Sequence, residues 1–188
     1  MTRVLRGLLV GLGLGLTLAS AAGAQDAPPR RQGFWFHLGL GYGTADFNCD
    51  NCGTTSREGG LAGTAAVGGT LSPQLLLGVE SDGWYKDESG IKVSYGSLNA
   101  VAYYYPMRSG GLFLKAGGGL ATYRFSNGGS VDDTGLGLLG GVGVDVPISR
   151  SVSLTPTVTF NAAMMGDNQG AQGVTINWLT LGASVTMH

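Results

Sequence analysis

Apolar residues alternate with polar or small residues along most of this chain, with a period of two. That is the pattern of a β-strand, whose successive side chains point to opposite faces of a sheet. The clearest example is the segment 151–163, where one face is apolar and the other carries hydroxyl groups. In it, Val152, Leu154, Val158, Phe160 and Ala162 alternate with Ser153, Thr155, Thr157, Thr159 and Asn161.

Eight segments show this alternation and are the predicted strands. They are 34–43, 59–71, 74–84, 92–105, 111–124, 135–146, 151–163 and 174–187. Eight such strands suit a soluble sandwich as well as a barrel, so their number does not choose between the two architectures.

The connections between the predicted strands alternate in length. Those at 72–74, 106–110 and 147–150 are short, 85–91 is intermediate, and 46–58, 125–133 and 164–173 are long. Short periplasmic turns and longer external loops are typical of outer-membrane barrels. The sequence therefore predicts an all-β fold: a closed antiparallel up-and-down transmembrane β-barrel of about eight strands over residues 33–188. A soluble periplasmic ligand-binding barrel, with its apolar face turned inward, is the alternative.

Aromatic residues give a second indication, because they concentrate near the ends of the predicted strands. In a membrane barrel, aromatic residues form girdles at the two interfaces. One set is predicted near the periplasmic end: Phe34, Trp35, Phe36, Tyr103, Tyr104, Tyr105 and Phe113. The other is predicted near the outer end: Tyr42, Phe47, Trp84, Tyr85, Tyr95, Tyr123, Phe125, Phe160 and Trp178.

The first 24 residues have the three regions of a secretory signal peptide. Arg3 and Arg6 precede an apolar run, and small residues follow up to Ala24, after which cleavage is expected. The run is too short, and too rich in glycine, for a membrane-spanning helix of about 20 residues. Residues 25–32 are predicted to be a flexible N-terminal segment.

Composition agrees with export to a membrane and argues against a nucleic-acid partner. The chain has 35 glycines and only 12% charged residues. Without Arg3 and Arg6 the mature chain has nine basic and twelve acidic residues, a net charge of −3. The basic residues are scattered singly, so no polyanion-binding surface is indicated.

Four charged residues fall on the predicted inward face: Glu80, Asp82, Lys115 and Asp145. An eight-stranded barrel is narrow enough for side chains to fill it, so no open pore is expected. Because buried charges require partners, Lys115 is predicted to bridge at least one of these acids in a lumen charge network. Pro156 lies within a predicted strand, where it should cause a β-bulge or the loss of one ladder hydrogen bond.

The two cysteines, Cys49 and Cys52, lie in the first predicted external loop. Since export brings them to an oxidising compartment, a disulfide between them is predicted. A zinc site is the alternative, but it would need further ligands that the neighbouring sequence does not offer. The acids Asp46, Asp50 and Glu58 of this loop could also attract divalent cations.

No enzyme, cofactor or metal site is predicted. The two histidines, His37 and His188, both fall near the periplasmic end, and neither stands beside a serine in the sequence. A lipid hydrolase would need such a base for its nucleophile. The glycine runs alternate within strands and are not nucleotide-binding loops.

Three strand cores resemble those of small single-domain outer-membrane β-barrels of the OmpA/OmpX type: 36–42 (FHLGLGY), 114–120 (LKAGGGL) and 139–145 (LGGVGVD). The resemblance covers nearly all of residues 33–188. It implies an eight-stranded barrel of a Gram-negative outer membrane, inserted by the outer-membrane assembly machinery and in contact with outer-membrane lipid and lipopolysaccharide. Such chains often finish with phenylalanine, whereas this one ends at His188.

The leading functional hypothesis is a structural or surface-interaction role through the external loops, without an open pore. A narrow channel for small hydrophobic solutes and a lipid-modifying enzyme are the alternatives within the membrane.

Overall fold

The computed structural model describes residues 31–48, 57–88, 90–126, 130–165 and 174–188. These residues form eight long strands and one strand of two residues. The long strands are β1 (Phe34–Asn48), β2 (Glu58–Ser72), β3 (Leu75–Glu88), β4 (Ile91–Tyr104), β5 (Leu112–Ser126), β6 (Ser130–Val144), β8 (Val152–Met164) and β9 (Thr175–Met187). The short strand β7 (Val146–Pro147) follows β6. No helix within the described ranges is long and apolar enough to cross a membrane.

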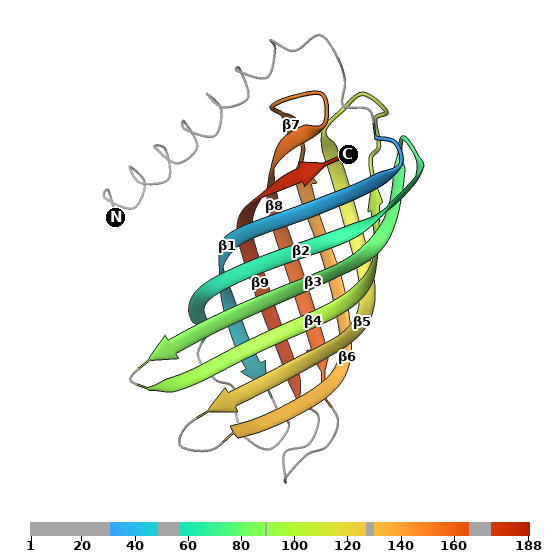
Figure 1. Ribbon diagram of the computed structural model, residues 1–188. Coiled ribbons are helices and arrows are strands. Elements are labelled where there is room, and N and C mark those ends of the chain that lie inside the picture. Colours follow the sequence, from blue (N-terminus) through green and yellow to red (C-terminus); the bar gives the residue numbers. More distant parts are fainter. Residues whose placement is uncertain (1–30, 49–56, 89, 127–129, 166–173) are drawn as a thin grey trace, which may run out of the picture.

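The eight long strands close into an antiparallel barrel, which confirms the predicted fold class (Figure 1). Each pairs with its neighbours in sequence, and β1 pairs with β9 from Phe36↔Met187 to Asn48↔Thr175. The short turns after β2, β4 and β7 lie at one end, together with the C-terminus. We call this the turn end, and the opposite end the loop end.

Several strands continue further toward the loop end than the alternation predicted. β1 runs to Asn48 and β6 begins at Ser130, so the connections predicted at 46–58 and 125–133 are partly strand. These extensions are held by ladder hydrogen bonds and by ion pairs such as Arg124 with Asp132, which are cross-strand partners. Apolar alternation therefore marks only the apolar band of a strand, whereas polar cross-strand pairs extend the ladder beyond it.

The apolar face of the sheet points outward. Leu40 is 79% exposed, Phe34 is 70% exposed and Leu61 is 67% exposed. The polar partners in the alternation, such as Thr155 and Asn161, are buried in the lumen. The alternative of a soluble barrel with its apolar face inward is therefore wrong, because the faces have the orientation required by lipid.

Pro156 interrupts the sheet without a bulge. The register of β8 with β9 is unchanged from Val152 to Met164. On the other side of β8, pairing with β6 stops at Gly143↔Thr157, and pairing with β7 begins at Val146↔Leu154. Of the two predicted outcomes, the loss of ladder pairing is the one that occurs. On the other side of β6, the N–H of Asp145 donates to the carbonyl of Gly111 at 2.9 Å and continues the register with β5.

Tight curvature brings some backbones close together, and Gly119 of β5 shows the consequence. A Cβ at this position would lie 2.0 Å from the carbonyl oxygen of Leu98, whereas a Cβ at Gly140 would meet nothing within 4 Å. Glycine at 119 is thus required by the approach of β4.

We therefore expect Gly119→Ala to lower the free energy of unfolding by about 1–3 kcal/mol, because the methyl group forces the two strands apart. Urea titration of the barrel in detergent measures the change. Gly140→Ala is the matched control, and should change stability by less than about 0.5 kcal/mol. Equal effects of the two substitutions would show that close approach is not what selects glycine here.

Candidate functional site

A buried ion pair lies within the lumen. Lys115 on β5 donates from Nζ to the Glu80 carboxylate on β3, and neither side chain has any exposed surface. The Tyr103 hydroxyl donates to the other oxygen of the same carboxylate. Tyr103 is the cross-strand partner of Lys115, so the β4–β5 register places both groups beside Glu80. Charge pairing and hydrogen bonding offset the cost of removing these ions from water.

The structure places all four predicted lumen charges inside the barrel, but it divides them into two groups. Glu80 pairs with Lys115, and Asp82 stands two positions further along β3 on the same inward face. Asp145 is buried at the turn end among different partners. The predicted bridge from Lys115 to at least one of these acids is present, since Lys115 pairs with Glu80. Asp145 belongs to a separate group because it follows the last residue of β6, nearer the turn end than the other three.

Asp145 is the centre of the turn-end group. Its carboxylate accepts hydrogen bonds from the hydroxyls of Tyr105 and Thr155, both at 2.8 Å, and His188 Nε2 lies 3.5 Å away. Burial raises the pKa of the Asp145 carboxyl, but His188 and the two hydroxyls stabilise the carboxylate more strongly, so the pKa lies below its ordinary value. Asp145 is therefore ionised at neutral pH.

Two further side chains, Thr186 and His37, extend this group along the lumen. Thr155 donates to Asp145, so the Thr155–Thr186 contact at 2.8 Å requires Thr186 as the donor. Thr186 must then accept from Nδ1 of His37, at 2.9 Å. His37 consequently serves Thr186 as a donor and not as a base. Among the described residues, this contact resembles a nucleophile–histidine pair, but a catalytic histidine would have to accept the hydroxyl proton, and here it donates instead. Thr186 is also buried, so a substrate has no access to its hydroxyl.

Two aromatic clusters fill the rest of the lumen, one toward each end. The turn-side cluster contains the buried rings of Trp35, Tyr103, Tyr105 and Phe113. The loop-side cluster contains those of Trp84, Tyr95 and Trp178. The prediction placed these seven rings in membrane girdles and is wrong for them, because they stand on the inward positions of their strands.

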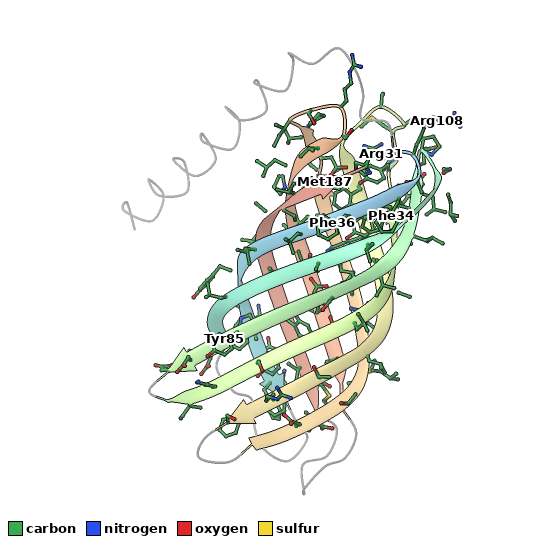
Figure 2. The ribbon with its side chains drawn as sticks, viewed as in Figure 1. Arg31, Phe34, Phe36, Tyr85, Arg108 and Met187 are labelled. Carbon is green, nitrogen blue, oxygen red and sulfur yellow. The ribbon has the colours of Figure 1, made fainter. Side chains whose placement is uncertain are left out.

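Other aromatic residues do face outward. Those that are more than a third exposed are Phe34, Phe36, Tyr42, Tyr85, Tyr104 and Phe160. Figure 2 shows Phe34 and Phe36 near the turn end and Tyr85 toward the loop end of β3. Rings on the outer surface thus occur toward both ends, as membrane girdles require.

Arg31 is the residue that sequence analysis missed. It was assigned to the flexible segment 25–32, but its side chain is only 1% exposed at the turn end (Figure 2). Its guanidinium lies 3.5 Å above the Tyr105 ring, and Nε lies 3.9 Å from Asp145. It also donates to the carbonyls of Gly110 and Arg108 in the β4–β5 turn. Only its position shortly before β1 hinted at this role.

Some predictions fall on residues that the structure does not describe. Cys49 and Cys52 lie outside the described residues, so their disulfide remains a prediction, as does signal cleavage after Ala24. Within the described ranges, no group of three or more histidine, cysteine or acidic side chains is placed to hold a metal ion.

These features define the class: the fold is that of the small eight-stranded β-barrels of outer membranes. Neisserial surface protein A is similar, with a TM-score of 0.55 and 18% identity over 81% of this chain and 96% of that one. The attachment invasion locus protein Ail of Yersinia pestis is similar, with a TM-score of 0.54 and 14% identity over 83% of this chain and 99% of that one.

Ail has also been solved in complex with the heparin analogue sucrose octasulfate. That structure matches with a TM-score of 0.53 and 13% identity over 83% of this chain and 100% of that one. No family model and no curated protein sequence matches the chain. At these identities the likeness establishes the fold, and the function has to be argued from this chain's own residues.

Removing one partner of the central ion pair should be costly. We expect Lys115→Met to lower the free energy of unfolding by about 3–5 kcal/mol, because Glu80 is left buried without its cation. Adding Glu80→Gln should restore at least half of that loss. Urea unfolding of the two variants tests this, with Lys92→Met on the exposed part of β4 as the control. A double variant no more stable than the single one would contradict it.

Arg31 should stabilise the turn end by a similar mechanism. We expect Arg31→Met to cost about 2–3 kcal/mol, because it removes charged hydrogen bonds to buried carbonyls. Arg31→Lys should not restore stability, since an ammonium cannot reproduce the planar fork of donors. Arg108→Met, at an exposed arginine of the adjoining turn, provides the baseline in the same unfolding assay. Equal stability of the Arg31 and Arg108 variants would show that Arg31 contributes nothing.

Proposed function

We propose that this chain is an outer-membrane protein that acts by surface contact at its loop end, on a barrel that has no open pore. In this proposal the outward apolar face contacts the acyl chains of phospholipid and lipopolysaccharide. The outer-membrane assembly machinery inserts the barrel, and the loop end faces the exterior.

The observation that carries the proposal is the filled lumen. The buried Lys115–Glu80 pair crosses it between β5 and β3, and an aromatic cluster lies toward each end. A solute passing through would have to separate a desolvated ion pair and displace packed rings. With no path through the barrel, the surface most available for a specific function is the loop end.

The same packing argues against the channel for small hydrophobic solutes. Such a passage needs a continuous apolar lining, but inward positions between the aromatic clusters carry Glu80, Asp82, Asn99 and Lys115. An apolar solute would strip these groups of their polar partners, which is costly.

The charge of the loop end indicates which partners fit it. Among the described residues it carries six acidic side chains, Asp46, Glu58, Asp87, Glu88, Asp132 and Asp133, and four basic ones, Arg57, Lys86, Lys92 and Arg124. Arg57 pairs with Asp46, Lys86 with Glu58 and Glu88, and Arg124 with Asp132. A sulfated ligand such as that of Ail would meet three bases that are already paired with carboxylates, and Lys92 in a surface with more acidic than basic side chains. We therefore infer a neutral or cationic partner.

Whole cells test the orientation. The mature chain has three lysines, of which Lys86 and Lys92 lie at the loop end and Lys115 is buried. A membrane-impermeant amine reagent should label Lys86 and Lys92 in intact cells, and the Lys86→Arg/Lys92→Arg variant should lose that labelling. Labelling that appears only after the outer membrane is permeabilised would overturn the proposed orientation.

The same cells also test whether the loop end acts by surface contact. Replacing residues 49–56 and 166–173 by short turns should abolish adhesion to host-cell monolayers, while lysine labelling and heat-modifiable migration stay unchanged. Purified protein in planar bilayers should show no regular conductance steps. Unchanged adhesion, or regular steps in the bilayer, would contradict the proposed function.

A further inference from the structure

A cavity of about 210 Å³ opens at the loop end of the lumen. Its lining comes from β1 to β5 and includes Phe47, Trp84, Tyr95, Tyr123 and Phe125. This is smaller than the roughly 300–1,000 Å³ typical of sites for drug-sized ligands. The cavity therefore suits a molecule with few non-hydrogen atoms.

The aromatic rings of this cavity form a continuous series. Tyr95 stacks on Trp84 with ring centroids 5.1 Å apart, and on Tyr123 with centroids 5.5 Å apart. Phe47 continues the series against Tyr123 at 6.1 Å. The series follows the register, since Trp84, Tyr95 and Tyr123 are successive cross-strand partners.

The position of the rings is fixed by buried contacts. Trp84 Nε1 donates to the carbonyl of Gly43 at 3.1 Å, and Trp178 packs against Tyr95 with centroids 6.1 Å apart. Tyr95 and Trp84 are buried, whereas Tyr123 and Phe47 are half-buried at the opening. The cavity is thus preorganised before any ligand binds, which reduces the entropic cost of binding.

The charge of the lining selects the ligand. Glu58 is the one charged residue among the described lining residues. Its partner Lys86 is shared with Glu88, so one ammonium group serves two carboxylates and the three residues keep a net charge of −1. The negative faces of aromatic rings also attract cations.

We propose that this cavity binds a small organic cation of the quaternary ammonium class, with its methyl groups on the rings of Tyr123 and Phe47 and its charge toward Glu58. The inference rests on the proposed function in one respect, since it assumes that the loop end faces the exterior. To the proposed function, this inference adds the chemical class of the ligand. A neutral sugar would also stack on aromatic rings, but it would gain nothing from the negative charge at Glu58.

Choline and its neutral isostere 3,3-dimethyl-1-butanol provide the test, because they differ in the charged nitrogen and have the same shape. Each is titrated at constant ionic strength against the full mature chain in phosphatidylglycerol nanodiscs, which contain no ammonium lipid. Tryptophan fluorescence reports binding through Trp84. We expect saturable binding of choline at least about fivefold tighter than that of the isostere, corresponding to about 1 kcal/mol.

Two variants locate the site. Tyr123→Leu should weaken choline binding about fivefold, by removing a ring face. Glu58→Gln should weaken it about threefold, by removing the charge. Asp87→Asn is the matched control, because it removes an exposed carboxylate of the loop end that neither lines the cavity nor pairs with Lys86. Heat-modifiable migration shows that each variant is folded.

The possible outcomes distinguish failure of the cavity proposal from failure of the proposed orientation. Equal binding of choline and the isostere, tighter binding of methyl glucoside, or equal effects of Glu58→Gln and Asp87→Asn would overturn the proposal. Choline binding without whole-cell labelling of Lys86 and Lys92 would leave the cavity proposal standing and refute only the orientation. Labelling without choline binding would refute the cavity proposal alone.

Discussion

Pairing of β1 with β9 is the constraint on which the rest of the structure depends. In a hydrocarbon layer an unpaired strand edge would leave a row of N–H and C=O groups without partners, so the sheet has to close. Here closure uses a continuous register from Phe36↔Met187 to Asn48↔Thr175. Once eight strands close, the diameter is fixed, and every inward side chain must fit the same narrow space.

That narrow space accounts for the composition of the lumen. Where neighbouring backbones approach closely, as at Gly119, an inward position has no room for a side chain. Elsewhere large rings and polar groups fill the volume, and the one buried lysine is matched by Glu80 and Tyr103. The polar middle and the aromatic ends are complementary, because the rings shield the ion pair from water at both ends.

The two ends of the barrel differ in the same physical terms. At the turn end, Arg31 and Asp145 form a desolvated cluster that connects the residues before β1 to the β4–β5 turn. At the loop end, ion pairs are solvent-exposed and a preorganised aromatic cavity remains open. A rigid closed end and an open end rich in functional groups are consistent with a barrel that acts at one surface.

Sequence alone determined the strands, their order and the inward positions of Glu80, Asp82, Lys115 and Asp145, because a period of two assigns each residue to a face. It could not determine which residues on one face meet. Register and curvature decided that Lys115 pairs with Glu80, that Asp145 lies apart from them, that the inward rings gather in two clusters, and that Arg31 is buried. Those contacts join residues far apart in the chain, and only closure of the sheet brings them together.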